Sequence, residues 1–123
     1  MKDENGRPPY DICDRTFQFA LRIVKLSQWL EEKPGTPRTL ARQLLRAGTS
    51  IGANVEEGQA GQSRADFVSK YSIARKGARE TKYWLRLLAA AGICKEARIA
   101  PLLIETDELI RILTAIIKKA QNR

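Results

Sequence analysis

Arginine and lysine side chains recur at helical spacing in two parts of this sequence. One row has steps of four, three and four residues: Arg75, Arg79, Lys82 and Arg86. The other row has steps of four residues: Arg38, Arg42 and Arg46. These steps keep side chains on one face of an α-helix. Cations held in rows on a rigid element can bind phosphate or carboxylate oxygens, so the chemistry indicated is recognition of a polyanion.

The overall charge points to the same chemistry. The chain has 22 Lys and Arg residues against 14 Asp and Glu residues, which gives a formal net charge of +8. A surplus of this kind could serve solubility alone. The cations are periodic, however, and this favours binding to nucleic acid or to an acidic protein.

Enzymatic and metal chemistry have little support in the sequence. There are no histidines, so the usual general base and the commonest metal ligand are both absent. Four carboxylates could in principle hold magnesium for a nuclease: Glu56, Glu57, Asp66 and Glu80. They match no recognisable motif, and we therefore predict no catalytic site, no metal and no cofactor.

The cysteines and the hydropathy of the sequence predict the cellular setting. Cys13 and Cys94 lie far apart, and two reduced thiols in a cytosolic protein are favoured over a disulfide. The polar start of the chain is not a signal peptide, and no apolar run approaches the ~20 residues that span a bilayer. We predict a cytoplasmic protein without a membrane partner.

The periodicity predicts four helices, over residues 14–32, 38–57, 63–91 and 95–121. Asp14 and Ser63 are expected to cap the first and third helices. The apolar seam of the third is the clearest: Phe67, Tyr71, Ala74, Ala78, Thr81, Leu85 and Leu88. With short connections and no strand pattern, these helices predict an all-α, antiparallel up-and-down four-helix bundle. Residues 1–12 are expected to form a flexible tail and residues 13–123 a single domain.

The first and fourth predicted helices each carry a second apolar stripe, so their apolar faces are wider than packing against a single core requires. The first adds Phe17, Leu21 and Val24 to its main seam. The fourth adds Leu103, Ile110 and Ile117, and also contains Pro101, where a kink or a late helix start is expected. For the first helix this width indicates contact with more than one neighbour. For the fourth helix, burial in an oligomer and a broad bundle core explain the surplus equally well.

Polar residues and glycines interrupt the apolar seams of the second and third predicted helices. Ser50, Asn54 and Glu57 stand beside the seam of the second helix, and Glu80 is a lone acid among the cations of the third. A structural polar network that fixes helix register is favoured over a ligand site. The glycines inside these helices indicate close approach of another helix, while Gly58 and Gly61 suit a helix stop and a turn. For Trp84, a core or subunit contact is favoured over stacking on a base.

The sequence from 50 to 58, Ser-Ile-Gly-Ala-Asn-Val-Glu-Glu-Gly, is followed by Phe67 and Ala74-Arg75. This block resembles bacterial four-helix-bundle proteins first noted as open reading frames in intervening sequences of large-subunit ribosomal RNA genes. The resemblance covers nearly the whole chain after the tail. The segment 84–89, Trp-Leu-Arg-Leu-Leu-Ala, is also similar to the accessory variability proteins of diversity-generating retroelements.

The resemblance implies a small basic bundle that assembles into a homopentamer. In the retroelement branch it also implies binding to a reverse transcriptase and to nucleic acid. Together with the cationic rows, it leads us to expect a non-enzymatic, oligomeric accessory protein that binds RNA or DNA with low sequence specificity. The alternative is an interaction scaffold whose arginines bind an acidic protein, without a direct nucleic-acid role.

Overall fold

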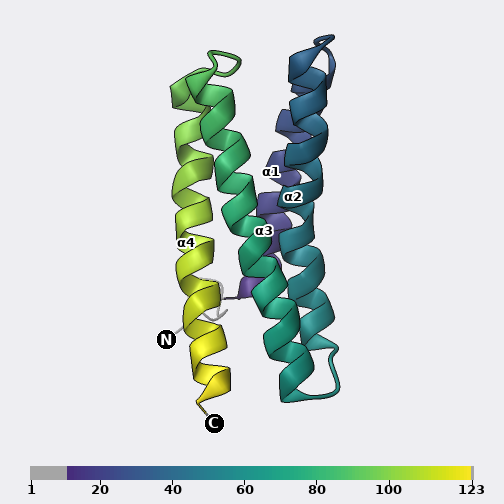
Figure 1. Cartoon of the computed structure of the whole chain (residues 1–123), viewed down its shortest axis with the longest axis vertical. Helices are drawn as coiled ribbons and strands as arrows, with labels where there is room; N and C mark the ends of the chain where they lie inside the picture. Colours follow the sequence, from purple (N-terminus) through teal and green to yellow (C-terminus); the bar gives the residue numbers. More distant parts are fainter. Residues whose placement is uncertain (1–10, 123) are drawn as a thin grey trace.

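The computed structural model describes residues 11–122 and contains four α-helices. They are α1 (Ile12–Glu31), α2 (Thr36–Gln59), α3 (Arg64–Ala90) and α4 (Glu96–Gln121). The helices run alternately up and down, so α1 begins and α4 ends at the same end of the molecule (Figure 1). No strand occurs in the described part of the chain. The predicted all-α four-helix fold is therefore confirmed.

The first helix begins earlier than the sequence predicts. Asp11, not Asp14, is its N-cap residue, and the Asp11 carboxylate accepts a hydrogen bond of 3.3 Å from the backbone N–H of Asp14. Asp14 instead lies in the first turn, where a negative charge suits the helix dipole. The ordered bundle thus includes Ile12, which is buried. The predicted tail otherwise falls on residues 1–10, outside the described residues.

The other helix ends follow local chemistry. Pro37 lies in the first turn of α2, where its missing N–H costs nothing, and the helix starts just before it. Ser63 caps α3 as predicted, because its hydroxyl accepts from the backbone N–H of Asp66 at 3.1 Å. Gly92 follows α3 with a φ of 75°, a left-handed conformation that favours glycine. Pro101 stands inside α4, which starts before it at Glu96, so the late start considered for this helix does not occur.

The core consists of one apolar stripe from each helix. The third-helix seam is buried along most of its length, including Tyr71, Leu85 and Leu88. It meets Phe19 and Ile23 of α1, Leu44 and Ile51 of α2, and the stripe of α4 in one continuous cluster. The stripe of α4 contains Ile99, Leu102, Leu109, Ile112, Leu113 and Ile117.

Small residues allow α2 to approach its neighbours closely. A Cβ atom built on Gly48 would lie 2.7 Å from Cγ2 of Ile23 on α1, and one on Gly77 would lie 2.6 Å from the Ser50 hydroxyl. Gly58 was expected to stop α2, and that expectation is wrong. It lies inside the helix, where a Cβ would meet the Tyr71 ring at 2.7 Å.

Replacing Gly48 by alanine should destabilise the fold by about 1–2 kcal/mol. The new methyl would overlap Cγ1 and Cγ2 of the fully buried Ile23, which lie too close to the backbone to move aside easily. The strain therefore falls in the upper part of the usual range, about 2–3 kcal/mol, and outweighs the ~1 kcal/mol that alanine gains in helix propensity. Denaturant unfolding followed by circular dichroism measures the change. Ser69→Ala, on the exposed side of α3, provides a control that should be neutral or slightly stabilising. A Gly48→Ala protein as stable as this control would contradict the packing described here.

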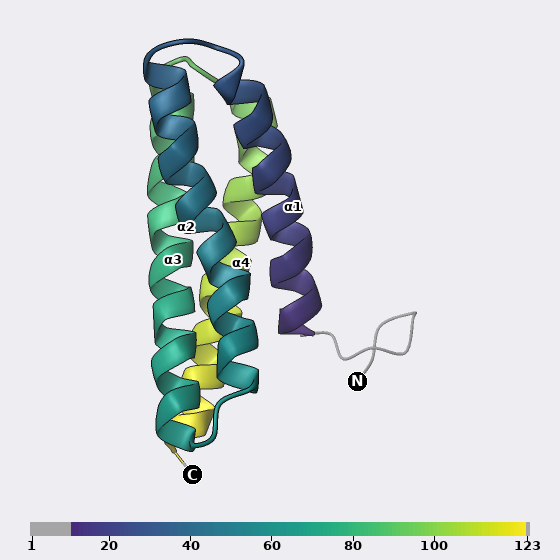
Figure 2. The ribbon, with the colours of Figure 1, turned by 90° about the vertical axis from the view of Figure 1, so that its right-hand side faces the viewer.

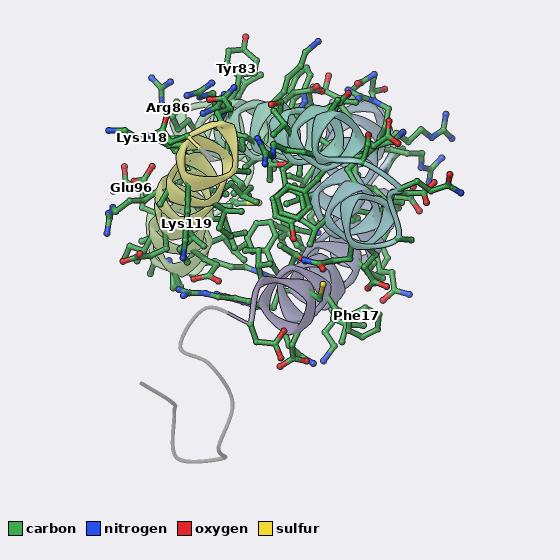
Figure 3. The ribbon with its side chains drawn as sticks, turned by 90° about the horizontal axis from the view of Figure 1, so that it is seen from below. Phe17, Tyr83, Arg86, Glu96, Lys118 and Lys119 are labelled. Carbon is green, nitrogen blue, oxygen red and sulfur yellow. The ribbon has the colours of Figure 1, made fainter. Side chains whose placement is uncertain are left out.

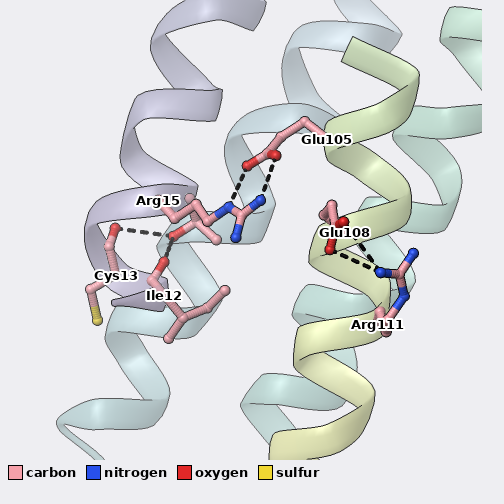
Figure 4. A network of polar contacts seen from close by, with 7 residues as sticks. Ile12, Cys13, Arg15, Glu105, Glu108 and Arg111 are labelled. Atoms are coloured by element: carbon pink, nitrogen blue, oxygen red, sulfur yellow. Dashed lines mark hydrogen bonds and ion pairs between the residues drawn. The ribbon is translucent and has the colours of Figure 1, made fainter. Parts of the chain in front are cut away.

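The interface between α1 and α4 differs from the other three. The helix pairs α1–α2, α2–α3 and α3–α4 pack closely along their length, whereas α1 and α4 make few contacts. Figure 2 shows α1 set apart from its neighbours toward its N-terminal end. A bidentate ion pair spans this interface: the Arg15 guanidinium donates to both carboxylate oxygens of Glu105, at 2.8 and 2.9 Å (Figure 4). This pair fixes α4 to the first turn of α1.

Candidate nucleic-acid interface

The cationic row of α3 lies on its outer side and along the edge that faces α4. Arg79 and Arg86 are exposed and have no hydrogen-bond or ion-pair partner among residues 11–122. Arg75 is half-buried and donates to the Thr114 hydroxyl at 3.4 Å. Lys82 forms a salt bridge of 2.8 Å with Asp107 of α4. The predicted row is therefore brought together on one surface, and the guanidinium groups of Arg79 and Arg86 are unpaired within the residues that the structure describes.

The arginines of α2 have a more mixed environment. Arg42 is exposed without a partner in the described chain. Arg38 donates to the backbone carbonyl of Glu31 at 3.1 Å. Arg46 forms an ion pair with Glu80 of α3 and also donates to Gln43 at 2.9 Å. This row follows the outside of α2, and its C-terminal member, Arg46, meets α3.

Carboxylates neutralise only a small part of the predicted surface. Of the seven cations, Lys82 and Arg46 are the two that have an acidic partner in the described part of the chain. The other five have no such partner: Arg38, Arg42, Arg75, Arg79 and Arg86. Positive charge therefore remains available to an external polyanion.

Glu80 links α2 to α3. Its carboxylate accepts from the indole N–H of Trp84 at 2.9 Å and forms an interhelical ion pair with Arg46 of α2. The hydrogen bond from Trp84 and that from Arg46 hold the pKa of Glu80 below its ordinary value of 4.5, and the charge of Lys76 acts in the same direction. Glu80 thus fixes both Trp84 and the α2–α3 edge.

Replacing Glu80 by glutamine should lower stability at neutral pH by at most about 1 kcal/mol, since the pair is partly exposed. Because the folded-state pKa is lowered, the stabilisation is complete above pH 4.5 and is lost as the pH falls through the lowered value. Denaturant unfolding at a series of pH values should show the two proteins converging in acid. Glu57→Gln is the matched control, because Glu57 is exposed and has no hydrogen bond within residues 11–122. A difference between Glu80→Gln and the parent that persists unchanged at pH 3 would contradict this assignment.

Of the four residues predicted to form a polar network, Ser50 and Asn54 are connected, and Glu57 and Glu80 lie apart from them. The Ser50 hydroxyl donates to the Ala47 carbonyl at 2.7 Å, and the Asn54 amide donates to the Ser50 carbonyl at 2.8 Å. Both side chains thus bond to the backbone of their own helix. Glu57 faces solvent and Glu80 lies on the outer α2–α3 edge, so neither carboxylate joins Ser50 and Asn54. Ser50 and Asn54 use their side chains to bond carbonyls of their own helix, and Glu57 stands about 10 Å from Ser50 along the helix axis.

Sequence reasoning overlooked Tyr83 as a surface residue. Its side chain is 53% exposed and extends away from the bundle beside Arg86 (Figure 3). Trp84, which was considered for base stacking and assigned to a core or subunit contact, packs against the core and is held by Glu80. The signal for Tyr83 was present in the spacing, since it lies four residues after Arg79 and three before Arg86.

An apolar strip lies on the opposite side of the bundle. Phe17 and Leu21 of α1 are 53% and 43% exposed, and Phe17 points away from the other helices (Figure 3). They stand one helical turn apart and form a continuous patch. Val24, the third member of the predicted second stripe, is half-buried.

Other chemistry finds little support in the described residues. Within residues 11–122 no group of three or more histidine, cysteine or acidic side chains could hold a metal ion. Cys13 and Cys94 are free thiols, and burial raises the pKa of both, which disfavours the reactive thiolate. Among the helices described, none combines the length and apolar character needed to cross a membrane.

Comparison with known proteins places the fold. A protein from Bacteroides thetaiotaomicron, described as of unknown function and from the S23 ribosomal protein family, has a similar crystal structure with a TM-score of 0.81. The two sequences are 38% identical, and the match covers 87% of this chain and 98% of that one. No curated protein matches the chain. Residues 9–115 match the model of the 23S rRNA-intervening sequence protein family, and this chain belongs to that family.

Proposed function

We propose that the protein is a non-enzymatic, oligomeric accessory protein that binds nucleic acid with low sequence specificity. The observation that carries this proposal is the presence on one rigid helix of exposed Arg79 and Arg86, which have no partner among residues 11–122, beside Arg75. Binding of their guanidinium groups to phosphates would release condensed counterions, which is the main source of affinity in non-specific complexes. The net charge of +8 adds attraction at longer range.

Low specificity follows from the kind of contact available. Guanidinium groups on an outer helix face can reach phosphates of any sequence, and phosphate contacts carry no base information. The name of the family refers to 23S rRNA, and this supports RNA as the first nucleic acid to test.

Binding of a labelled mixed-sequence RNA and of a DNA of the same sequence, measured by fluorescence anisotropy in low salt, tests the proposal. Both should bind, with affinities that change little when the sequence is scrambled. Absence of binding to either nucleic acid at low salt would exclude this function. Recovery of one acidic protein from nuclease-treated lysate, without nucleic-acid binding by the pure protein, would instead support the scaffold alternative.

Self-assembly is part of the proposal. The Phe17–Leu21 strip offers apolar surface that a second copy could cover, and the resemblance to ring-forming bundles makes a homopentamer the assembly to expect. A ring would repeat the cationic surface and raise avidity by placing several phosphate contacts on one molecule. Among protein partners, a reverse transcriptase is the one that the resemblance to retroelement accessory proteins suggests.

A further inference from the structure

Tyr83 projects from the middle of the proposed phosphate-binding surface. Its ring meets Trp84 edge-on, with the ring centroids 5.1 Å apart and the ring planes at 76°. Trp84 is itself fixed by its hydrogen bond to Glu80 and by packing against the core. The tyrosine ring is thus braced on one side by a rigid neighbour while more than half of its surface faces solvent.

Two cations that have no partner in the described part of the chain flank this ring. Arg79 precedes Tyr83 by four residues and Arg86 follows it by three, so both lie on the same side of α3. The helical rise separates them from Tyr83 by about 6 Å and about 4.5 Å along the axis. Arg86 also stands at the rim of a shallow groove of about 380 Å³ between α3 and α4. The surface therefore alternates a guanidinium, an aromatic ring and a second guanidinium.

We propose that this surface binds single-stranded nucleic acid in preference to duplex, with one unpaired base stacked on Tyr83 and the adjoining phosphates on Arg79 and Arg86. The inference rests on the proposed function and names the form of nucleic acid that the surface takes. In a duplex the base faces are covered by neighbouring bases, so only the backbone can meet the protein. In a single strand the face of a base is open, and stacking on an aromatic side chain contributes roughly 1–3 kcal/mol without regard to sequence.

The test compares a single-stranded oligonucleotide, its duplex and an abasic strand of the same length, using the parent protein and three variants. Tyr83→Ala should weaken single-strand binding by roughly 5- to 150-fold, which corresponds to the loss of one stacked base. Affinity for the duplex and for the abasic strand should change less than twofold. Tyr83→Phe should retain single-strand binding, because stacking needs the ring and not the hydroxyl. Ile104→Ala is the control, since it removes an exposed apolar side chain, 65% exposed, from the outer face of α4.

Three results would overturn the inference. The first is that the parent protein binds the single strand and the duplex with equal affinity. The second is that Tyr83→Ala weakens binding to both by the same factor. The third is that Tyr83→Ala changes the native mass, which would place the ring between copies of the chain. These outcomes differ from failure of the proposed function, in which the parent protein binds none of the three nucleic acids.

Discussion

Simultaneous replacement of Arg75, Arg79 and Arg86 by glutamine is expected to weaken RNA binding by about 10- to 100-fold at low salt. Each exposed charge contact contributes about 0.5–1 kcal/mol, and three such losses give this range. The substitutions should leave helicity unchanged, because none of these side chains forms a salt bridge within residues 11–122. Anisotropy titration measures the affinity, and circular dichroism verifies the fold.

A second triple variant distinguishes a local surface from net charge. Arg22, Lys25 and Arg98 are exposed, the first two on α1 and the third over the ring of Trp29 of α1. Their replacement by glutamine removes the same three charges from the side of the bundle away from the α3 row. RNA affinity should fall less than threefold. Equal losses in the two triple variants would show that total charge, and not the α3 surface, governs binding.

Replacement of both Phe17 and Leu21 by serine is expected to dissociate the proposed assembly into monomers. Full burial of an apolar side chain contributes about 1.5–3 kcal/mol. Because Phe17 and Leu21 are 53% and 43% exposed, covering the remainder of each contributes about half of that, and a closed ring loses this contribution at every interface. Because both side chains already face solvent in the isolated chain, the monomer should keep its helical content. Light scattering coupled to size exclusion measures the native mass.

Ile104→Ser is the matched control for assembly, because Ile104 is exposed on α4 and belongs to no apolar strip. It should leave the native mass unchanged. A parent protein that is already monomeric at micromolar concentration would contradict assembly through this chain alone. An unchanged mass in the Phe17, Leu21 variant would show that the contact lies on another face.

Helix number and the buried stripes could be predicted from the sequence because both depend on local periodicity. The seam that contains Tyr71, Leu85 and Leu88 is buried as its spacing predicts. A helix end was predicted where a single residue determines it, as with Ser63. They were missed where two candidates compete, as with Asp11 and Asp14.

The partners of the cations could not be read from a single helix. Arg46 and Glu80 are 34 residues apart, and Lys82 pairs with Asp107 of the next helix, so only the packing of the bundle shows that these two charges are neutralised. Gly58 was assigned to a helix stop because the ring of Tyr71, which requires its missing side chain, is distant in sequence. Tyr83 was overlooked because the adjacent Trp84 is the larger aromatic, and sequence alone does not show which of the two faces solvent.

The salt dependence of RNA binding tests the central claim most directly. Affinity of the parent protein should fall linearly on a log–log plot as salt rises, with a slope of about −0.7 for each single-strand phosphate contacted. The variant that lacks Arg75, Arg79 and Arg86 should give a slope that is shallower by about 2. Binding that is indifferent to salt, or identical slopes for the two proteins, would contradict the account.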